Sequence, residues 1–349
     1  MHFVLPRSVC VFCLMLSVLG CKREERRLAL SEQEVQFSIE QDGSKLHLGH
    51  DGVVYRDSEN PREWIVVEKV YDPEEFRTAY VNEGEKVFRV SPDSDKRFEV
   101  LRQFDENFDD LPLGIAGLND IVHERRLKWG SFTLQSPRKP TVEDYVELRK
   151  QLLDGKADFA DARIEVSSAQ RVSGEQALRC EVPPRNSQMI TCKSSLSTPL
   201  VYFKNGDDFW YEAFYFIEGG FPLTLADLEC EFVKNHPGIR LRFYNTNELG
   251  VELKALDKPQ YKQGSGAKIT FPRDKWVRVR AHFRLSAFDG IIEVWQDETK
   301  IIDAMGATLP FPVAIYNSLE IGASAYSELE GTSIVYVDDV RISDRPFEP

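Results

Sequence analysis

The sequence predicts a mainly β protein, with one large sandwich of strands preceded by a small β-rich region. From about residue 162 to the C-terminus, short runs of alternating apolar and polar residues follow one another, separated by Gly, Pro, Asn and Asp. This arrangement is typical of antiparallel sandwiches. The 22 Phe, 12 Tyr and 5 Trp supply the bulky side chains that strands favour. The strands do not alternate regularly with helices, so the pattern does not predict a parallel sheet.

Residues 1–20 are predicted to be a targeting segment rather than part of the fold. Arg7 provides a positive charge, and Val9–Leu19 is apolar but too short to span a bilayer comfortably. The stretch Ser17–Cys21 resembles a bacterial lipobox, whose cysteine becomes acylated. We therefore expect an exported protein that is attached to the bacterial cell envelope by a lipid on Cys21. An ordinary signal peptide or an uncleaved membrane anchor is the alternative.

The remaining chain divides into three predicted parts. Residues 21–34 are highly charged and are expected to form a tether. Residues 35–103 contain short alternating runs and predict a small β-rich region, either separate or added to the sandwich. Residues 104–349 form the main domain, with one helix inserted at 141–154. The helix is predicted from the N-cap residue Thr141 and from apolar residues at helical spacing.

The strands of the main domain are predicted from two-residue periodicity, which places alternate side chains on opposite faces. They are Ala162–Ser167, Gln176–Val182, Phe209–Ile217, Ile239–Tyr244, Val251–Leu256, Lys268–Phe271, Trp276–Leu285, Gly290–Trp295, Leu319–Ala323 and Ser333–Ile342.

Charge and cysteine content limit the partners. The net charge of −13 argues against nucleic acid as the main partner, because a phosphate backbone requires a basic surface. Three cysteines follow Cys21. Of these, Cys180 and Cys192 either form a disulfide in an oxidising compartment or remain buried thiols, and Cys230 is the third.

Several segments in the second half follow a recognisable order. They are Ser173–Arg179, Trp276–Arg280, Gly290–Asp297 and Val335–Ile342. Together they resemble the concanavalin A-like jelly-roll superfamily, and particularly its branch of alginate, glucuronan and heparin lyases. The resemblance implies a jelly-roll fold over roughly residues 104–345, and a polysaccharide as the partner.

The resemblance also implies the chemistry of a lyase, in which a cationic side chain neutralises a uronate carboxylate and a base removes the adjacent proton. Arg179 matches the neutralising arginine of alginate lyases. The Gln-x-His and Tyr-x-Lys-x-Gly-x-Tyr motifs of those enzymes are absent. His236 is the candidate base near the place of the first motif, with a loop tyrosine as the alternative. Whether the chain cleaves its ligand is therefore open.

Two strands carry arginines at alternate positions. Arg240 and Arg242 lie in one, and Arg278 and Arg280 in the other. If both sets share one surface, they form a positive groove that is suited to carboxylate or sulfate groups. The alternative is that both lie on an outer, solvated face and pair with Asp and Glu.

Acidic pairs provide two further candidates. Glu229 and Glu231, with Asp227, resemble the paired carboxylates of laminarinase-type glycoside hydrolases, and a solvated acidic strand is the alternative. Asp338 and Asp339 are candidate ligands of a structural calcium ion, or else cap a turn. The sequence thus predicts a lipoprotein that recognises, and in one interpretation cleaves, a polysaccharide. The arginines favour an acidic polysaccharide. The alternative is a structural or protein-binding envelope protein.

Overall fold

The computed structural model describes residues 27–28, 35–41, 44–59, 63–91, 96–122, 128–187, 189, 191–220, 222–244, 247–254, 259–264, 266, 268–323 and 331–348. The predicted targeting segment and Cys21 lie outside these residues. The chain divides into two compact units. The first comprises residues 1–73 with 255–258, and the second comprises residues 74–254 with 259–349. Among the described residues, no helix combines the length and apolar character needed to cross a membrane.

The first unit contains one antiparallel sheet with the strand order β1-β5-β4-β3-β2. Its strands are β1 (Arg27–Leu28), β2 (Val35–Gln41), β3 (Ser44–Gly49), β4 (Val53–Asp57) and β5 (Trp64–Lys69). Leu48, Val54, Tyr55 and Ile65 are buried. Gly52 closes the turn between β3 and β4 at φ +76°, where a Cβ atom would meet the carbonyl oxygen of Tyr71. This turn therefore requires glycine.

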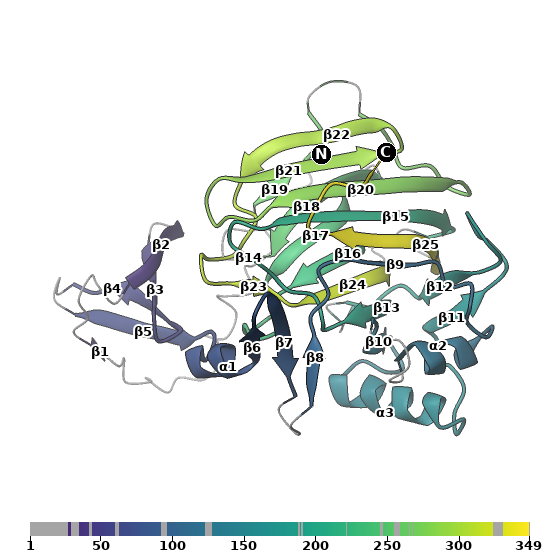
Figure 1. Cartoon of the computed structure of the whole chain (residues 1–349), viewed down its shortest axis with the longest axis horizontal. Coiled ribbons are helices and arrows are strands. Elements are labelled where there is room, and N and C mark those ends of the chain that lie inside the picture. The colour runs from purple at the N-terminus through teal and green to yellow at the C-terminus, as the bar shows by residue number, and fades with distance from the viewer. Residues whose placement is uncertain are drawn as a thin grey trace. The chain divides into compact units, whose positions relative to one another are not determined.

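The second unit is an antiparallel sandwich of two sheets, so the predicted jelly-roll sandwich is confirmed (Figure 1). The seven-stranded sheet has the order β10-β13-β24-β16-β17-β18-β19. Its strands are β10 (Ser131–Gln135), β13 (Lys193–Thr198), β16 (Thr224–Glu229), β17 (Gly238–Tyr244), β18 (Glu248–Lys254), β19 (Gln260–Tyr261) and β24 (Ser318–Ala323).

The eight-stranded sheet has the order β11-β12-β25-β15-β20-β21-β22, and β9 also pairs with β25. Its strands are β9 (Phe104–Glu106), β11 (Arg163–Ser167), β12 (Ala177–Val182), β15 (Asp208–Glu218), β20 (Trp276–Arg284), β21 (Gly290–Gln296), β22 (Thr299–Gly306) and β25 (Ser333–Ser343). The strand expected at Lys268–Phe271 was wrong, because that segment pairs with no neighbouring strand.

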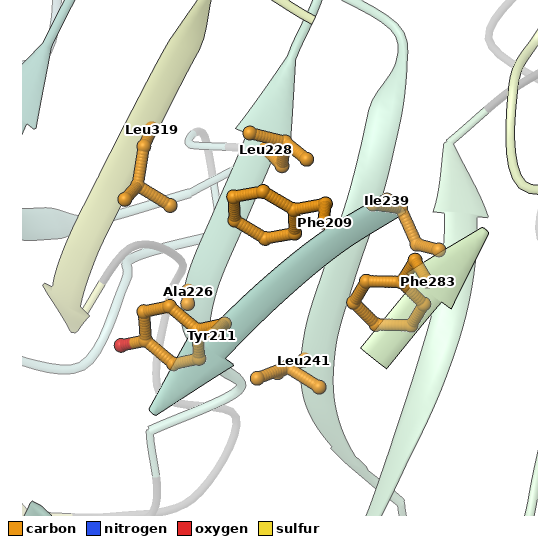
Figure 2. A pocket seen from close by; sticks show the side chains of 8 residues that line it. All are labelled: Phe209, Tyr211, Ala226, Leu228, Ile239, Leu241, Phe283 and Leu319. Carbon is orange, nitrogen blue, oxygen red and sulfur yellow. The ribbon is translucent and has the colours of Figure 1, made fainter. Parts of the chain in front are cut away.

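The core lies between the two sheets, where alternate residues of facing strands meet. A void of about 10 Å³ remains there, lined by Phe209, Tyr211, Ala226, Leu228, Ile239, Leu241, Phe283 and Leu319 (Figure 2). The void holds at most one water molecule. Its lining is apolar apart from the hydroxyl of Tyr211, which hydrogen-bonds that of Tyr215 at 2.5 Å. This void is therefore part of the core and not a ligand site.

Smaller elements complete the second unit. The predicted helix is confirmed as α3 (Val142–Leu153), which begins with a capping box between Thr141 and Asp144. Two shorter helices, α1 (Pro73–Thr78) and α2 (Ile115–Val122), were not predicted, because their few turns show little periodicity. The strands β14 (Phe203–Lys204) and β23 (Ile315–Tyr316) form a two-stranded sheet.

A three-stranded sheet, β6 (Tyr80–Glu83), β7 (Lys86–Val90) and β8 (Arg97–Glu99), also belongs to the second unit. Arg89 attaches it to the sandwich by donating to the carbonyl oxygen of Pro199 and to Glu231 at 3.1 Å. Part of the β-rich region predicted at 35–103 is thus joined to the main domain, through contacts that are remote in sequence. Cys180, Cys192 and Cys230 are buried free thiols.

Candidate functional site

The outer face of the seven-stranded sheet carries an unusual set of charged side chains. The inward residues of these strands fill the core, so the alternate residues point outward. In the described part of the chain, four carboxylates and four basic side chains on this face interact; we call them the charge network. Its members are Lys193, Asp227, Glu229, Arg240, Arg242, Glu252, Lys254 and Glu320.

Strand register brings the centre of the charge network together. Glu320 is the Cα partner of Asp227, which pairs with Arg240, and Arg240 in turn pairs with Glu252. Gln260 of β19 follows Glu252 in the same row. Because directly opposed side chains on one face of a sheet are neighbours, this row crosses five strands with opposite charges side by side at its centre.

Glu252 connects the two arginines of β17. Its carboxylate lies 3.5 Å from Nη1 of Arg240 and accepts a hydrogen bond of 2.5 Å from Nη1 of Arg242. Gln260 donates to the same carboxylate at 3.2 Å. The guanidinium of Arg242 also lies 4.9 Å from the ring centroid of Tyr244. Glu252 is only 5% exposed, so these contacts are well shielded from water.

A lysine holds each of the other two glutamates. Lys193 lies 2.8 Å from Glu320, and Ser195 donates to the other oxygen of that carboxylate. Lys254 donates to Glu229. Burial by itself lowers the pKa of Lys193, but the surrounding carboxylates, led by Glu320, raise it above its usual value. Lys193 is therefore a fixed positive charge among the acids of this face.

Asp227 is the most buried acid of the charge network, at 2% exposure. Its Oδ1 lies 3.7 Å from Nε of Arg240, which is too far for a hydrogen bond, and neither atom has a hydrogen-bond partner among the described residues. Burial raises the pKa of Asp227, and the opposing effect of Arg240 and Lys254 does not cancel it. Asp227 is thus a carboxyl group that retains its proton more readily than an exposed aspartate does.

The raised pKa predicts how stability depends on pH. An aspartate titrates near pH 4 in the unfolded chain, so the contribution of Asp227 is complete below about pH 4 and is lost as pH rises toward the raised native value. Asp227→Asn removes this titration. From pH 4 to pH 7, the unfolding free energy of the variant should therefore increase relative to that of the wild type. Urea denaturation at a series of pH values measures this, and a constant or opposite trend contradicts it.

The structure brings together four of the residues singled out in the sequence: Asp227, Glu229, Arg240 and Arg242. Glu231 is separated from them, because it lies in the turn after β16 and pairs with Arg89 at 3.1 Å. His236 is exposed in the connection between β16 and β17, with φ at +44°. No hydrogen bond from its ring to the charge network is formed among the described residues.

Arg179 lies on β12 of the other sheet. There it pairs with Glu165 at 3.3 Å and with Glu181 at 2.6 Å. The side chain of Arg179 is therefore not on the same sheet face as those of Arg240 and Arg242, although two-residue periodicity correctly predicted that all three lie on strands. The role of Arg179 in neutralising a uronate carboxylate remains a prediction, because its guanidinium is already paired with two acids of its own sheet.

Arg278 and Arg280 also lie on the eight-stranded sheet, so the two sets of arginines do not share one surface. Arg278 pairs with Glu298 at 2.5 Å, and Arg280 lies 5.0 Å from the ring centroid of Trp295. Both arginines project from the outer face of that sheet, because the alternate residues Val277, Val279 and Ala281 are buried in the core. A single positive groove made from all four arginines is excluded by this strand order.

Asp338 and Asp339 secure a loop. The carboxylate of Asp338 accepts backbone hydrogen bonds from Val172 and Asp339, each at 2.8 Å, and Asp339 accepts one from the hydroxyl of Ser173 at 2.8 Å. Burial raises the pKa of Asp338 to about 6. No group of three or more His, Cys, Asp or Glu among the described residues is arranged to hold a metal ion. Calcium binding at this place remains a prediction without support from these contacts.

Sequence reasoning missed half of the charge network. Lys193 lies in a serine-rich strand without apolar alternation, and Glu252 and Lys254 lie in a strand selected only for its apolar residues. Glu320 offered a signal, since a lone acid stands between Leu319 and Ile321 in an otherwise apolar strand. Polar residues at alternate positions of several strands indicate a charged sheet face, but only the strand order shows which of these residues meet.

Comparison with known proteins adds little at the level of sequence. No family model matches the chain. No curated protein matches it either. Among solved structures, it is similar to the endo-β-1,4-glucuronan lyase of the fungus Trichoderma reesei, with 11% identity and a TM-score of 0.42, covering 62% of this chain and 95% of that one.

Two further structures are similar at the same level. The cellulose induced protein Cip1 has 12% identity and a TM-score of 0.41, covering 54% of this chain and 89% of that one. Domain 4 of the arabinanase AbnA from Geobacillus stearothermophilus has 13% identity and a TM-score of 0.39, covering 68% and 89%. These likenesses are too distant to assign a family or an activity to this chain.

Proposed function

We propose that the second unit binds a polysaccharide on the outer face of its seven-stranded sheet, through the charge network. The observation that carries this proposal is the burial of four acids, each paired with one or more of four half-buried bases, on the face of a sheet that points away from the core. Burying ion pairs costs free energy that apolar residues of similar size would not cost. Carboxyl groups whose pKa is shifted by burial beside a specific charged partner, as that of Asp227 is, are concentrated at functional sites.

Alternating acids and bases suit the hydroxyl groups of a sugar. A hydroxyl both donates and accepts, so it can bridge a carboxylate and a neighbouring basic group, and charged partners strengthen such bonds. The four positive and four negative charges of the network balance. This balance supports recognition of hydroxyl groups more than capture of a strongly anionic chain. The preference for an acidic polysaccharide is a separate proposal, which rests on the arginines rather than on the balance of charges.

Hydrolysis is a second candidate, which one observation favours. Asp227 and Glu229 lie two residues apart on one face of β16, about 6.6 Å along the strand by the usual rise. Burial holds the pKa of Asp227 up, whereas Glu229 is paired with Lys254. Two neighbouring carboxyl groups in unequal environments are what a glycosidase needs for its acid and its partner carboxylate.

Titration of the full chain with oligosaccharides tests binding. The ligands are taken from alginate and glucuronan, which are acidic, and from a β-1,4-glucan and an arabinan, which are neutral. Arg242→Gln removes a base whose partners include Glu252, and should weaken binding by about tenfold or more, the usual effect of losing a charge-assisted hydrogen bond. Arg278→Gln is the matched control on the other sheet, and should bind as the wild type does.

The same mixtures report cleavage. A rise in the ultraviolet absorbance of unsaturated uronates indicates a lyase, and new reducing ends from a neutral glycan that disappear in Asp227→Asn and Glu229→Gln indicate a hydrolase. Binding without either product supports a recognition role alone. If no ligand binds, or if Arg278→Gln weakens binding as much as Arg242→Gln, the proposal is wrong and a structural or protein-binding role is favoured.

We also propose export and anchoring through a lipid on Cys21, which rest on the sequence alone. Growth of cells that express the protein with a radiolabelled fatty acid should label the wild type and not Cys21→Ala. A label that persists in this variant, or a wild type that acquires none, contradicts the anchor. This result is independent of the sugar-binding test.

A further inference from the structure

Three polar side chains of the first unit form a hydrogen-bonded chain on neighbouring strands. Ser38 of β2 is the direct Cα partner of His47 of β3. The hydroxyl oxygen of Ser38 lies 2.9 Å from Nδ1 of His47, and Nε2 of the same ring lies 3.0 Å from Oδ1 of Asp57, at the end of β4. β2, β3 and β4 are consecutive and adjacent in one sheet, which brings the three residues together (Figure 1).

The ring of His47 is held in a fixed orientation. The residue is buried at 5% exposure, and its ring stacks on that of Trp64, with centroids 4.5 Å apart and planes 7° from parallel. The ring of Tyr55 lies 6.1 Å from that of Trp64 on the same sheet. This packing limits rotation of the imidazole, so both of its nitrogens remain directed at their partners.

The two partners decide which nitrogen of the neutral ring carries the proton. A carboxylate only accepts hydrogen bonds, so the contact with Asp57 places the proton on Nε2. Nδ1 then has a free lone pair, and the hydroxyl of Ser38 donates to it. This is the polarity of a nucleophile–base–carboxylate triad, in which the base accepts the proton of the nucleophile. Ser38 itself is exposed, so a substrate can reach it.

We propose that Ser38 is an activated nucleophile that reacts with small acyl esters. His47 acts as the general base, and Asp57 is the residue that positions it. Oγ of Ser38 forms a bond to the acyl carbon while the bond from that carbon to the leaving alcohol breaks. The serine proton passes to Nδ1 of His47 and then to the leaving alkoxide. Water later hydrolyses the acyl-serine, with His47 accepting the proton of the water and returning it to Oγ.

This proposal is independent of sugar binding. Ser38, His47 and Asp57 all belong to the first unit, whereas the charge network belongs to the second. Loss of one activity by substitution should therefore leave the other intact. Because the two sites lie in different units, the test of one proposal can fail without affecting the test of the other.

Reaction of the full chain with a fluorophosphonate probe, followed by peptide mass spectrometry, tests the proposal. The probe should modify Ser38, and the chain should release nitrophenol from p-nitrophenyl acetate. Ser38→Ala should abolish both reactions, and His47→Gln should slow them about a hundredfold or more, as loss of the base does in other triads. Ser44→Ala, at an exposed serine of β3 in the same sheet, is the matched control and should react as the wild type does.

The positioning role of Asp57 is tested with variants that should not disturb the fold. Asp57→Asn should slow the reaction by less than the ~10⁴-fold that the same change of a buried triad aspartate causes, since the Asp57 side chain is 57% exposed, while Asp57→Glu should retain most of the rate. Asp57 lies at the surface, so both variants should fold and remain informative even if His47→Gln loses its stacking on Trp64. Failure of the probe to modify Ser38 overturns the proposal, as do equal rates in the wild type, Asp57→Asn and His47→Gln.

Discussion

Glu252→Ala is expected to destabilise the second unit by about 3 kcal/mol, the effect of removing one partner from a buried ion pair. Glu252 is 5% exposed and is the carboxylate shared by Arg240 and Arg242. Its removal leaves two guanidinium groups without their acid in a shielded environment. Guanidinium denaturation followed by tryptophan fluorescence measures the loss, because four of the five tryptophans, Trp129, Trp210, Trp276 and Trp295, lie in this unit.

Two comparisons establish the cause of this loss. Glu298→Ala removes the partner of Arg278 on the other sheet, where the glutamate side chain is 85% exposed, and should change stability by less than about 1 kcal/mol. Adding Arg242→Met to Glu252→Ala should recover part of the loss, because it removes one of the uncompensated charges. If Glu252→Ala costs no more than Glu298→Ala, the charge network is not the shielded cluster described above.

Phe209→Ala should reduce the unfolding free energy of the same unit by about 3–5 kcal/mol, the range for a large-to-small change in a core. Phe209 is 2% exposed and lines the void between the two sheets (Figure 2). Its ring packs edge-on against Phe203 and parallel to Phe283, with centroids 4.8 and 6.4 Å away. Truncation enlarges an existing void, which the sheets cannot readily close because hydrogen bonds fix each strand.

Phe288→Ala is the matched control for this core substitution. Phe288 is 66% exposed, so the same truncation at this position should cost less than about 0.5 kcal/mol. Denaturant midpoints of the two variants and the wild type, measured under identical conditions, provide the comparison. Similar midpoints for both variants would contradict a close-packed core at Phe209.

The charge network explains why a site of this kind is only partly visible in a sequence. Arg240 and Arg242 were predicted to share a face, and they do, because the two-residue period of a strand is a local property. The acids of the charge network come from β16, β18 and β24, and the sequence separation of these strands says nothing about their order in the sheet. The contact of Ser38 with His47 depends instead on the register of a local hairpin, which two-residue periodicity alone does not fix.

Arg179, Arg278 and Arg280 illustrate the opposite error. Each was correctly expected on a strand with alternating faces, yet all three lie in the eight-stranded sheet, away from Arg240. In a sandwich, alternation tells which side chains point outward but not from which of the two sheets. A groove assembled from outward-facing residues therefore cannot be predicted until the strands are assigned to sheets.

By itself, the sequence determined the local features of this protein: its strand content, its inward- and outward-facing residues and the helix that begins with the capping box at Thr141. These follow from periodicity and capping, which act over a few neighbouring residues. The tertiary structure alone decided which sheet each strand joins, and thus that Lys193, Asp227 and Glu320 meet on one face. Such contacts depend on pairing between segments far apart in the chain, and that pairing is settled by the packing of the whole core.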